Sequence, residues 1–171
     1  MADPVALRQK YHPKIRKIVA YWKSIHPESG LPGRQHIDPS DFPDLLPHVR
    51  LVDVVGDPPR FRVRLCGDRI RDHFGSCQQG QYYDEMYPGF KDRPTFSDFM
   101  EAIATGEPSW NKGTCELNPE RIHVPLERIV LPLASDGKTV DMLLVISLFG
   151  EAGAGSTCVE PPVDAMQRAA R

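Results

Sequence analysis

The stretch Val140-Asp141-Met142-Leu143-Leu144-Val145-Ile146-Ser147-Leu148-Phe149 does most to decide the fold. Its middle, residues 142–146, is apolar at every position, so a strand formed there presents apolar side chains on both faces. An antiparallel strand usually leaves one face in contact with water. The pattern therefore predicts a strand at residues 140–149 that lies in the centre of a sheet and is covered from both sides.

Two further strands precede this stretch. Ser135-Asp136-Gly137-Lys138 contains the Asp-Gly pair that hairpin turns favour, and it predicts a turn from a strand at Ile122–Ala134 into the central strand. Asn118-Pro119-Glu120 predicts a second turn, which joins that strand to another at Ser109–Leu117. The second half of the chain is therefore expected to form a three-stranded antiparallel meander.

An earlier hairpin and a helical segment complete the order of elements. Strands are predicted at Val49–Val55 and Phe61–Cys66, with a tight reversal at Gly56-Asp57-Pro58-Pro59. Short helices are predicted between residues 68 and 105, and the longest of them starts at Pro94, because proline is tolerated in a first helical turn. These helices would cover one face of the sheet.

An amphipathic helix is predicted at Leu7–His26. Pro13 fits only the first turn of a helix, which places a second possible start near His12. The apolar face either packs on the sheet of its own chain or is shared with a second copy, and the two interpretations are compatible. We take this face as the candidate homodimer interface, and its residues recur at spacings of three and four: Leu7, Tyr11, Ile15, Ile18, Trp22 and Ile25.

Length and composition limit the class of protein. The chain has 171 residues, so one domain is expected, divided as an N-terminal helix at 1–28, a sheet domain at 29–150 and a flexible tail at 151–171. The net charge of −2 gives no argument for a nucleic-acid partner. No apolar run reaches the roughly 20 residues of a membrane helix, and the N-terminus lacks the apolar core of a signal peptide. We therefore expect a cytoplasmic protein.

The order of two strands, short helices and three strands is that of PAS domains. The chain resembles the single-domain PAS-like proteins that are widespread in alphaproteobacteria. The resemblance implies an α+β fold, with a five-stranded antiparallel sheet, helices that close a pocket against one face, and a flanking helix that often packs between subunits. It also implies a signalling or adaptor module without catalysis of its own. Five segments carry the resemblance: 30–34 with 38–39, 46–47, 61–67, Gly75 with Gly80, and 131–137.

PAS-like pockets can hold haem, flavin or small metabolites, and haem and flavin each need particular residues of the chain. Haem needs an axial ligand, most often histidine, and the helix from Pro94 carries none. The flavin site of the related light sensors needs a cysteine in an Asn-Cys-Arg-like run, which the surroundings of Cys77 lack. Histidines and cysteines occur singly, without metal-ligand spacing, and no nucleotide or nucleophile motif is present. No haem, flavin, metal or catalytic site is predicted, and the cofactor stays unassigned.

A small-molecule pocket remains as a hypothesis. Arg64 lies in the middle of the strand that contains Phe61 and Val63, and an arginine on a covered face needs a carboxylate or an anionic ligand. Alternatively, Arg64 is exposed or pairs with Asp53 across the first hairpin. The other candidates for the pocket, which alternatively serve as core residues, are Tyr83, Met86, Phe99, Trp110 and His123.

Three functions fit these patterns. The first is a PAS-like sensor or adaptor that binds a small molecule, a signalling partner protein or both. The second is a small acid–base enzyme on an α+β cone-like fold, with Asp53, Asp141 and His123 in an apolar cavity. The third is a structural dimer module without a ligand.

Overall fold

The structure is a computed structural model, and it describes residues 10–150. Leu7 and the tail predicted at 151–171 lie outside the described residues. The α-helices are α2 (Pro13–Ser24), α3 (Asp68–Phe74), α4 (Tyr83–Met86) and α5 (Pro94–Thr105). The short 3-10 helices are η1 (Arg34–His36), η2 (Pro39–Asp41), η3 (Pro43–His48), η4 (Phe90–Asp92) and η5 (Pro119–Arg121). The strands are β1 (Val49–Val55), β2 (Arg60–Cys66), β3 (Ser109–Thr114), β4 (Pro125–Leu133) and β5 (Met142–Phe149).

The five strands form one antiparallel sheet in the order β2-β1-β5-β4-β3. The predicted α+β class and five-stranded antiparallel sheet are confirmed, and β5 is the central strand. β3 and β4 are shorter than predicted, because η5 and the residues around it form the connection between them. The sheet therefore has two edges, β2 and β3, and a centre that is apolar on both sides.

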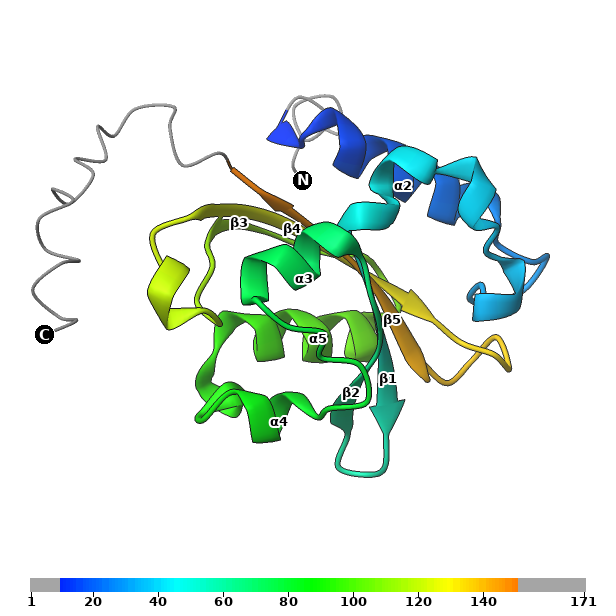
Figure 1. The fold of residues 1–171 in the computed structure, drawn as a ribbon. Helices are drawn as coiled ribbons and strands as arrows, with labels where there is room; N and C mark the ends of the chain where they lie inside the picture. Colours follow the sequence, from blue (N-terminus) through cyan, green and yellow to red (C-terminus); the bar gives the residue numbers. More distant parts are fainter. Residues whose placement is uncertain (1–9, 151–171) are drawn as a thin grey trace, which may run out of the picture.

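Helices cover the two faces of the sheet separately (Figure 1). Helices α3, α4 and α5 lie on one side, here called the helix face, and α2 lies on the other, here called the N-terminal face. Side chains of β5 point alternately to the two faces. Leu143 and Val145 belong to the core of the helix face, whereas Leu144 and Ile146 belong to the core of the N-terminal face. The apolar run at residues 142–146 is thus shared between two cores.

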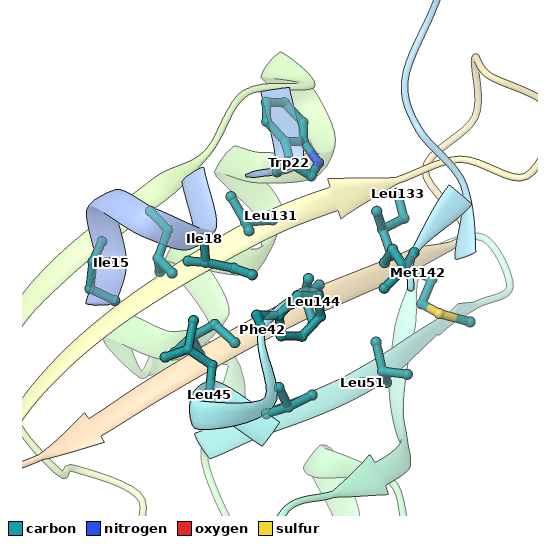
Figure 2. Packing of buried hydrophobic residues seen from close by; sticks show 14 of the residues in the cluster. Ile15, Ile18, Trp22, Phe42, Leu45, Leu51, Leu131, Leu133, Met142 and Leu144 are labelled. Atoms are coloured by element: carbon teal, nitrogen blue, oxygen red, sulfur yellow. The ribbon is translucent and has the colours of Figure 1, made fainter. Parts of the chain in front are cut away.

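Helix α2 starts at Pro13, with the ring Nδ1 of His12 accepting a hydrogen bond from the N–H of Lys14 at 3.1 Å. The start near His12 is therefore the one adopted, and the helix is shorter than Leu7–His26. Ile15, Ile18 and Trp22 are buried and lie over β4 and β5 (Figure 2). The apolar face of α2 thus packs on the sheet of its own chain.

The ring of Trp22 also makes a polar contact with the sheet. Its Nε1–H donates to the backbone carbonyl of Pro132 at 3.0 Å. Pro132 lies beyond the end of β3, whose first residue, Ser109, pairs with Val130. A proline there removes no hydrogen bond from the sheet, and its carbonyl is free for the indole.

A bulge changes the faces of β2. Leu51 pairs with Leu65 and Val52 pairs with Val63, so Arg64 has no partner residue in β1. Simple alternation along β2 would place Leu65 on the face of Phe61 and Val63, but beyond the bulge Leu65 pairs with Leu51, faces the N-terminal side and is 44% exposed.

The outer side of β2 is occupied by a short segment of the chain. The N–H of Gly80 donates to the carbonyl of Val63 at 2.7 Å, and the N–H of Val63 donates to the carbonyl of Gln81 at 2.9 Å. An isolated bridge joins Arg62 and Tyr82. Residues 80–82 thus protect this edge of the sheet.

Candidate functional site

A small cavity lies on the helix face, between the sheet and helices α3 and α5. Its volume is about 20 Å³, which gives room for one or two water-sized groups. The aromatic and aliphatic part of its wall includes Tyr83, Phe99 and Val145. Two arginines, Arg50 of β1 and Arg128 of β4, also line it. The cavity therefore combines an apolar wall with strong hydrogen-bond donors.

Arg50 is buried, with 5% of its surface exposed. Its Nη1 donates to the hydroxyl of Tyr83 at 3.0 Å, and its Nη2 donates to Oε1 of Gln78 at 2.6 Å. The guanidinium also lies over the ring of Phe74, at 4.8 Å from its centre. Its Nε has no hydrogen-bond partner, and no carboxylate of the described residues forms an ion pair with Arg50.

The two tyrosines beside Arg50 do not supply the missing negative charge. Burial raises the pKa of Tyr83, against the opposing effect of the Arg50 guanidinium. Burial likewise raises the pKa of Tyr87 to about 12. The Tyr87 hydroxyl shares hydrogen bonds with the amide of Gln78. Both phenols are therefore neutral near pH 7, and the buried charge of Arg50 is stabilised by neutral dipoles and ring faces alone.

Arg128 is equally buried but is paired. Its Nη2 lies 2.5 Å from Oδ2 of Asp98, and its Nη1 donates to Oγ1 of Thr95 at 2.8 Å. Oε1 of Glu116 lies 3.7 Å from Nη1 and accepts the N–H of Thr95 at 3.0 Å. Nε of Arg128 has no partner. Arg128 is thus paired with carboxylates of the described residues, whereas Arg50 is not.

His73 and Cys115 lie next to this cavity. Nε2 of His73 is 3.2 Å from Sγ of Cys115, and the imidazole stacks on Phe149 with ring centres 3.8 Å apart. Burial, with smaller effects of Arg121 and Arg50, lowers the pKa of His73 to about 4. Burial also raises the pKa of the Cys115 thiol. A neutral imidazole beside a protonated thiol lacks the thiolate that a nucleophilic cysteine needs.

The depressed pKa of His73 predicts a loss of stability in acid. A histidine whose pKa is lower in the folded state contributes fully above its unfolded value of about 6.5 and less as the pH falls from there toward 4. His73→Phe keeps a ring against Phe149 and removes the titrating group. We expect wild type to lose more stability than this variant between pH 7.5 and pH 5, measured by urea denaturation at both. Equal losses of stability in the wild type and in His73→Phe would contradict a lowered pKa of His73 in the folded state.

Comparison with protein families gives a match to the PAS domain over residues 10–147. The chain belongs to the PAS domain family. A comparison of folds finds the crystal structure of the Rhodobacter sphaeroides LOV protein, with a TM-score of 0.46 and 15% identity over 82% of this chain and 69% of that one. A sensory box sensor histidine kinase from Vibrio cholerae has a TM-score of 0.44 and 18% identity, over 64% of this chain and 84% of that one.

A third solved structure, an RNA-binding Light-Oxygen-Voltage receptor, has a TM-score of 0.43 and 17% identity, over 72% of this chain and 37% of that one. No curated protein matches the chain. The TM-scores of the three solved structures are all below 0.5 and their identities below 25%, so no property of these proteins is transferred to this chain. A ligand of this PAS domain can therefore be inferred only from its own residues.

Two of the six residues predicted for the pocket line the cavity, namely Tyr83 and Phe99. Met86 packs against the same core without lining the cavity. His123 is exposed in the connection before β4. Tyr83, Met86 and Phe99 lie in or next to the helices predicted between residues 68 and 105, on the helix face, whereas His123, predicted within the strand at Ile122–Ala134, precedes β4.

Arg64 and Trp110 lie on the opposite face of the sheet from the cavity. The side chain of Arg64 is 55% exposed, and its Nη1 lies 3.4 Å from Oδ1 of Asp53. This is the alternative pairing across the first hairpin, and the bulge at Arg64 accounts for it. Trp110 packs beside Tyr11 and donates from Nε1 to Oε1 of Glu127 at 3.1 Å. Its pairing with Ile129 fixes it on the N-terminal face.

The principal polar residues of the cavity, Arg50 and Arg128, were not predicted. Arg50 lies between two apolar residues, the same pattern that drew attention to Arg64, whereas Arg128 follows Glu127 and lacks this pattern. What distinguishes both from Arg64 is the position of their strands, because β1 and β4 each have a neighbour on both sides, whereas β2 forms an edge.

The residues expected at a dimer interface are largely covered within the chain. Ile15, Ile18 and Trp22 are buried, while Tyr11 and Ile25 are partly buried against the same core. The packing interpretation of this face therefore holds within one subunit. An interface formed by α2 has to use its partly exposed flank.

The residues of the alternative acid–base enzyme are engaged elsewhere. Asp53 pairs with Arg62 at 3.0 Å, Asp141 accepts hydrogen bonds from Ser135, and His123 is exposed. None of the three acid–base candidates lines the cavity. They do not form the cluster that this mechanism needs.

Within residues 10–150, no three His, Cys, Asp or Glu side chains are grouped so as to hold a metal ion. No helix in this range is both long and apolar enough to cross a bilayer. A haem or a flavin ring system is far larger than a cavity of about 20 Å³, so neither fits the cavity in this conformation.

Proposed function

We propose that this PAS domain is a sensory or adaptor module of cytoplasmic signalling, which binds a small molecule in the helix-face cavity and passes its occupancy to a partner protein. The supporting observation is the buried guanidinium of Arg50, which faces the cavity without a carboxylate partner. Burying an unpaired charge lowers stability, so a charged group retained in an apolar layer favours a binding role over a packing role.

The sheet offers a route from the cavity to the other face. Val145 lines the cavity, while its neighbours Leu144 and Ile146 pack in the core beneath α2. A ligand that displaces β5 or α5 therefore acts on two packed layers, which respond as units because cores are dense. We further propose that the chain forms a homodimer whose contact includes Tyr11 and Ile25, which lie just before and just after α2.

Native mass spectrometry of the purified protein tests the ligand. We expect a mass above that of the chain alone, lost on denaturation. Ser147→Val places two methyl groups into the cavity and is expected to abolish the added mass, while Ser97→Val, on the exposed side of α5, keeps it. Equal ligand content in both variants would place the ligand elsewhere, and no added mass in any of the proteins would favour an adaptor that acts by contact alone.

Sedimentation velocity tests the dimer. We expect the full chain to sediment with the mass of two chains, and Tyr11→Ser combined with Ile25→Ser to shift it toward one chain, because both residues lie at the rim of the buried face. A single-chain mass at every concentration would refute the homodimer. A dimer that the double variant leaves intact would move the interface away from α2.

A further inference from the structure

Two arginines that line the helix-face cavity have side-chain donors without acceptors. Among the described residues, two buried side-chain nitrogen or oxygen atoms have no hydrogen-bond partner, and they are Nε of Arg50 and Nε of Arg128. Both residues line the same cavity. A guanidinium donates and never accepts, so whatever occupies the cavity must supply acceptor atoms.

The charge around the cavity is uneven. Arg128 is paired with Asp98 and Glu116, and the Glu116 carboxylate, which also lines the cavity, already accepts from Thr95. At the other end, Arg50 meets the neutral hydroxyl of Tyr83 and the neutral amide of Gln78. An acceptor that carries negative charge is bound more strongly by Nε of Arg50 than water is, because charge-assisted hydrogen bonds are shorter and stronger.

We propose that the cavity binds a small monovalent anion, of the size of chloride, formate or nitrate, with the Nε–H of Arg50 as principal donor and that of Arg128 as a second donor. The volume of about 20 Å³ sets the size limit and excludes dicarboxylates and nucleotides in this conformation. This inference rests on the proposed ligand-binding function and specifies the chemical class of the ligand.

Side-chain nuclear magnetic resonance of the full chain, labelled with ¹⁵N-arginine, tests the inference directly. The Nε–H signals of Arg50 and Arg128 are followed during titration with sodium chloride, sodium formate or sodium nitrate, while sodium gluconate keeps the ionic strength constant. Gluconate is too large for the cavity. We expect the two signals to shift along one saturating curve, and the signals of exposed arginines such as Arg60 to change linearly and slightly.

Two matched variants separate the cavity from the surface. In the wild type we also expect chloride, formate or nitrate, but not gluconate, to raise Tm by several degrees. Arg50→Met removes the principal donor, and we expect it to abolish both this rise of Tm and the saturating shift of the Arg128 signal. Arg64→Met removes an exposed arginine from the same sheet and is expected to leave both responses unchanged. The titration of the wild type needs no variant, so the test stands even if Arg50→Met folds poorly.

The outcomes separate this inference from the proposed function. Cavity signals that follow the exposed arginines in all three salts would overturn the inference and indicate a cavity that holds water alone. If native mass spectrometry then still finds a ligand that Ser147→Val excludes, the proposed function stands and the ligand is not a small anion. Saturation in wild type that persists in Arg50→Met would place the anion elsewhere and also overturn the inference.

Discussion

Arg128→Met should lower the free energy of unfolding by about 3–5 kcal/mol, because removing one member of a buried ion pair leaves the other charges uncompensated. Methionine has a similar volume, so the loss reflects charge rather than a cavity. Asp98 and Glu116, whose side chains are 12% and 16% exposed, lose their common cation. Urea denaturation at pH 7, monitored by circular dichroism, measures the change.

Two controls identify the cause of that loss. Arg64→Met removes an arginine that is 55% exposed, and it should cost no more than about 0.5 kcal/mol, as surface substitutions usually do. Asp98→Asn in the Arg128→Met background removes one of the stranded charges, and the double variant should be more stable than the sum of the two single losses predicts. Strictly additive losses would show that Arg128 and Asp98 are not coupled.

Trp22→Ala should lower the free energy of unfolding by about 3–5 kcal/mol, as truncation of a buried aromatic side chain typically does. The indole lies in the core between α2 and the sheet (Figure 2), and its removal also leaves the carbonyl of Pro132 without its donor. The same urea titration measures the loss.

Trp22→Phe divides this loss into its two parts. It keeps most of the apolar ring and removes the hydrogen bond to Pro132, so it should cost about 1–3 kcal/mol, the usual cost of an unsatisfied buried polar group. A loss below about 1 kcal/mol for Trp22→Ala would contradict the tight packing of α2 on the sheet, since core truncations cost more than that.

The sequence predicted the architecture because the decisive signals are local. The apolar run at 142–146 required cover on both faces, and the turns at Asp136-Gly137 and Asn118-Pro119 separated the strands. Each of these signals depends on near neighbours in the chain. The class, the sheet and the central position of β5 were therefore predictable.

The site was less predictable, because the faces of residues depend on pairing between strands. Arg64 and Arg50 carry the same local pattern, an arginine between apolar residues. The bulge at Arg64 and the central position of β1 place one in solvent and the other in the core. Likewise, Trp110 faces α2 because of its register with Ile129. A bulge and a register are properties of two strands together, which periodicity within one strand does not specify.

The segment at residues 80–82 has a consequence for how copies of the chain can assemble. It already uses the backbone groups of Val63 on the outer side of β2, so a strand from another molecule finds that edge closed. Among residues 10–150, β3 is the opposite outer strand, and no strand pairs with its second side. If two molecules joined their sheets through β3, closed edges would remain at both ends. Growth by strand addition would then end at the pair, and a fibre of continuous sheet would not form.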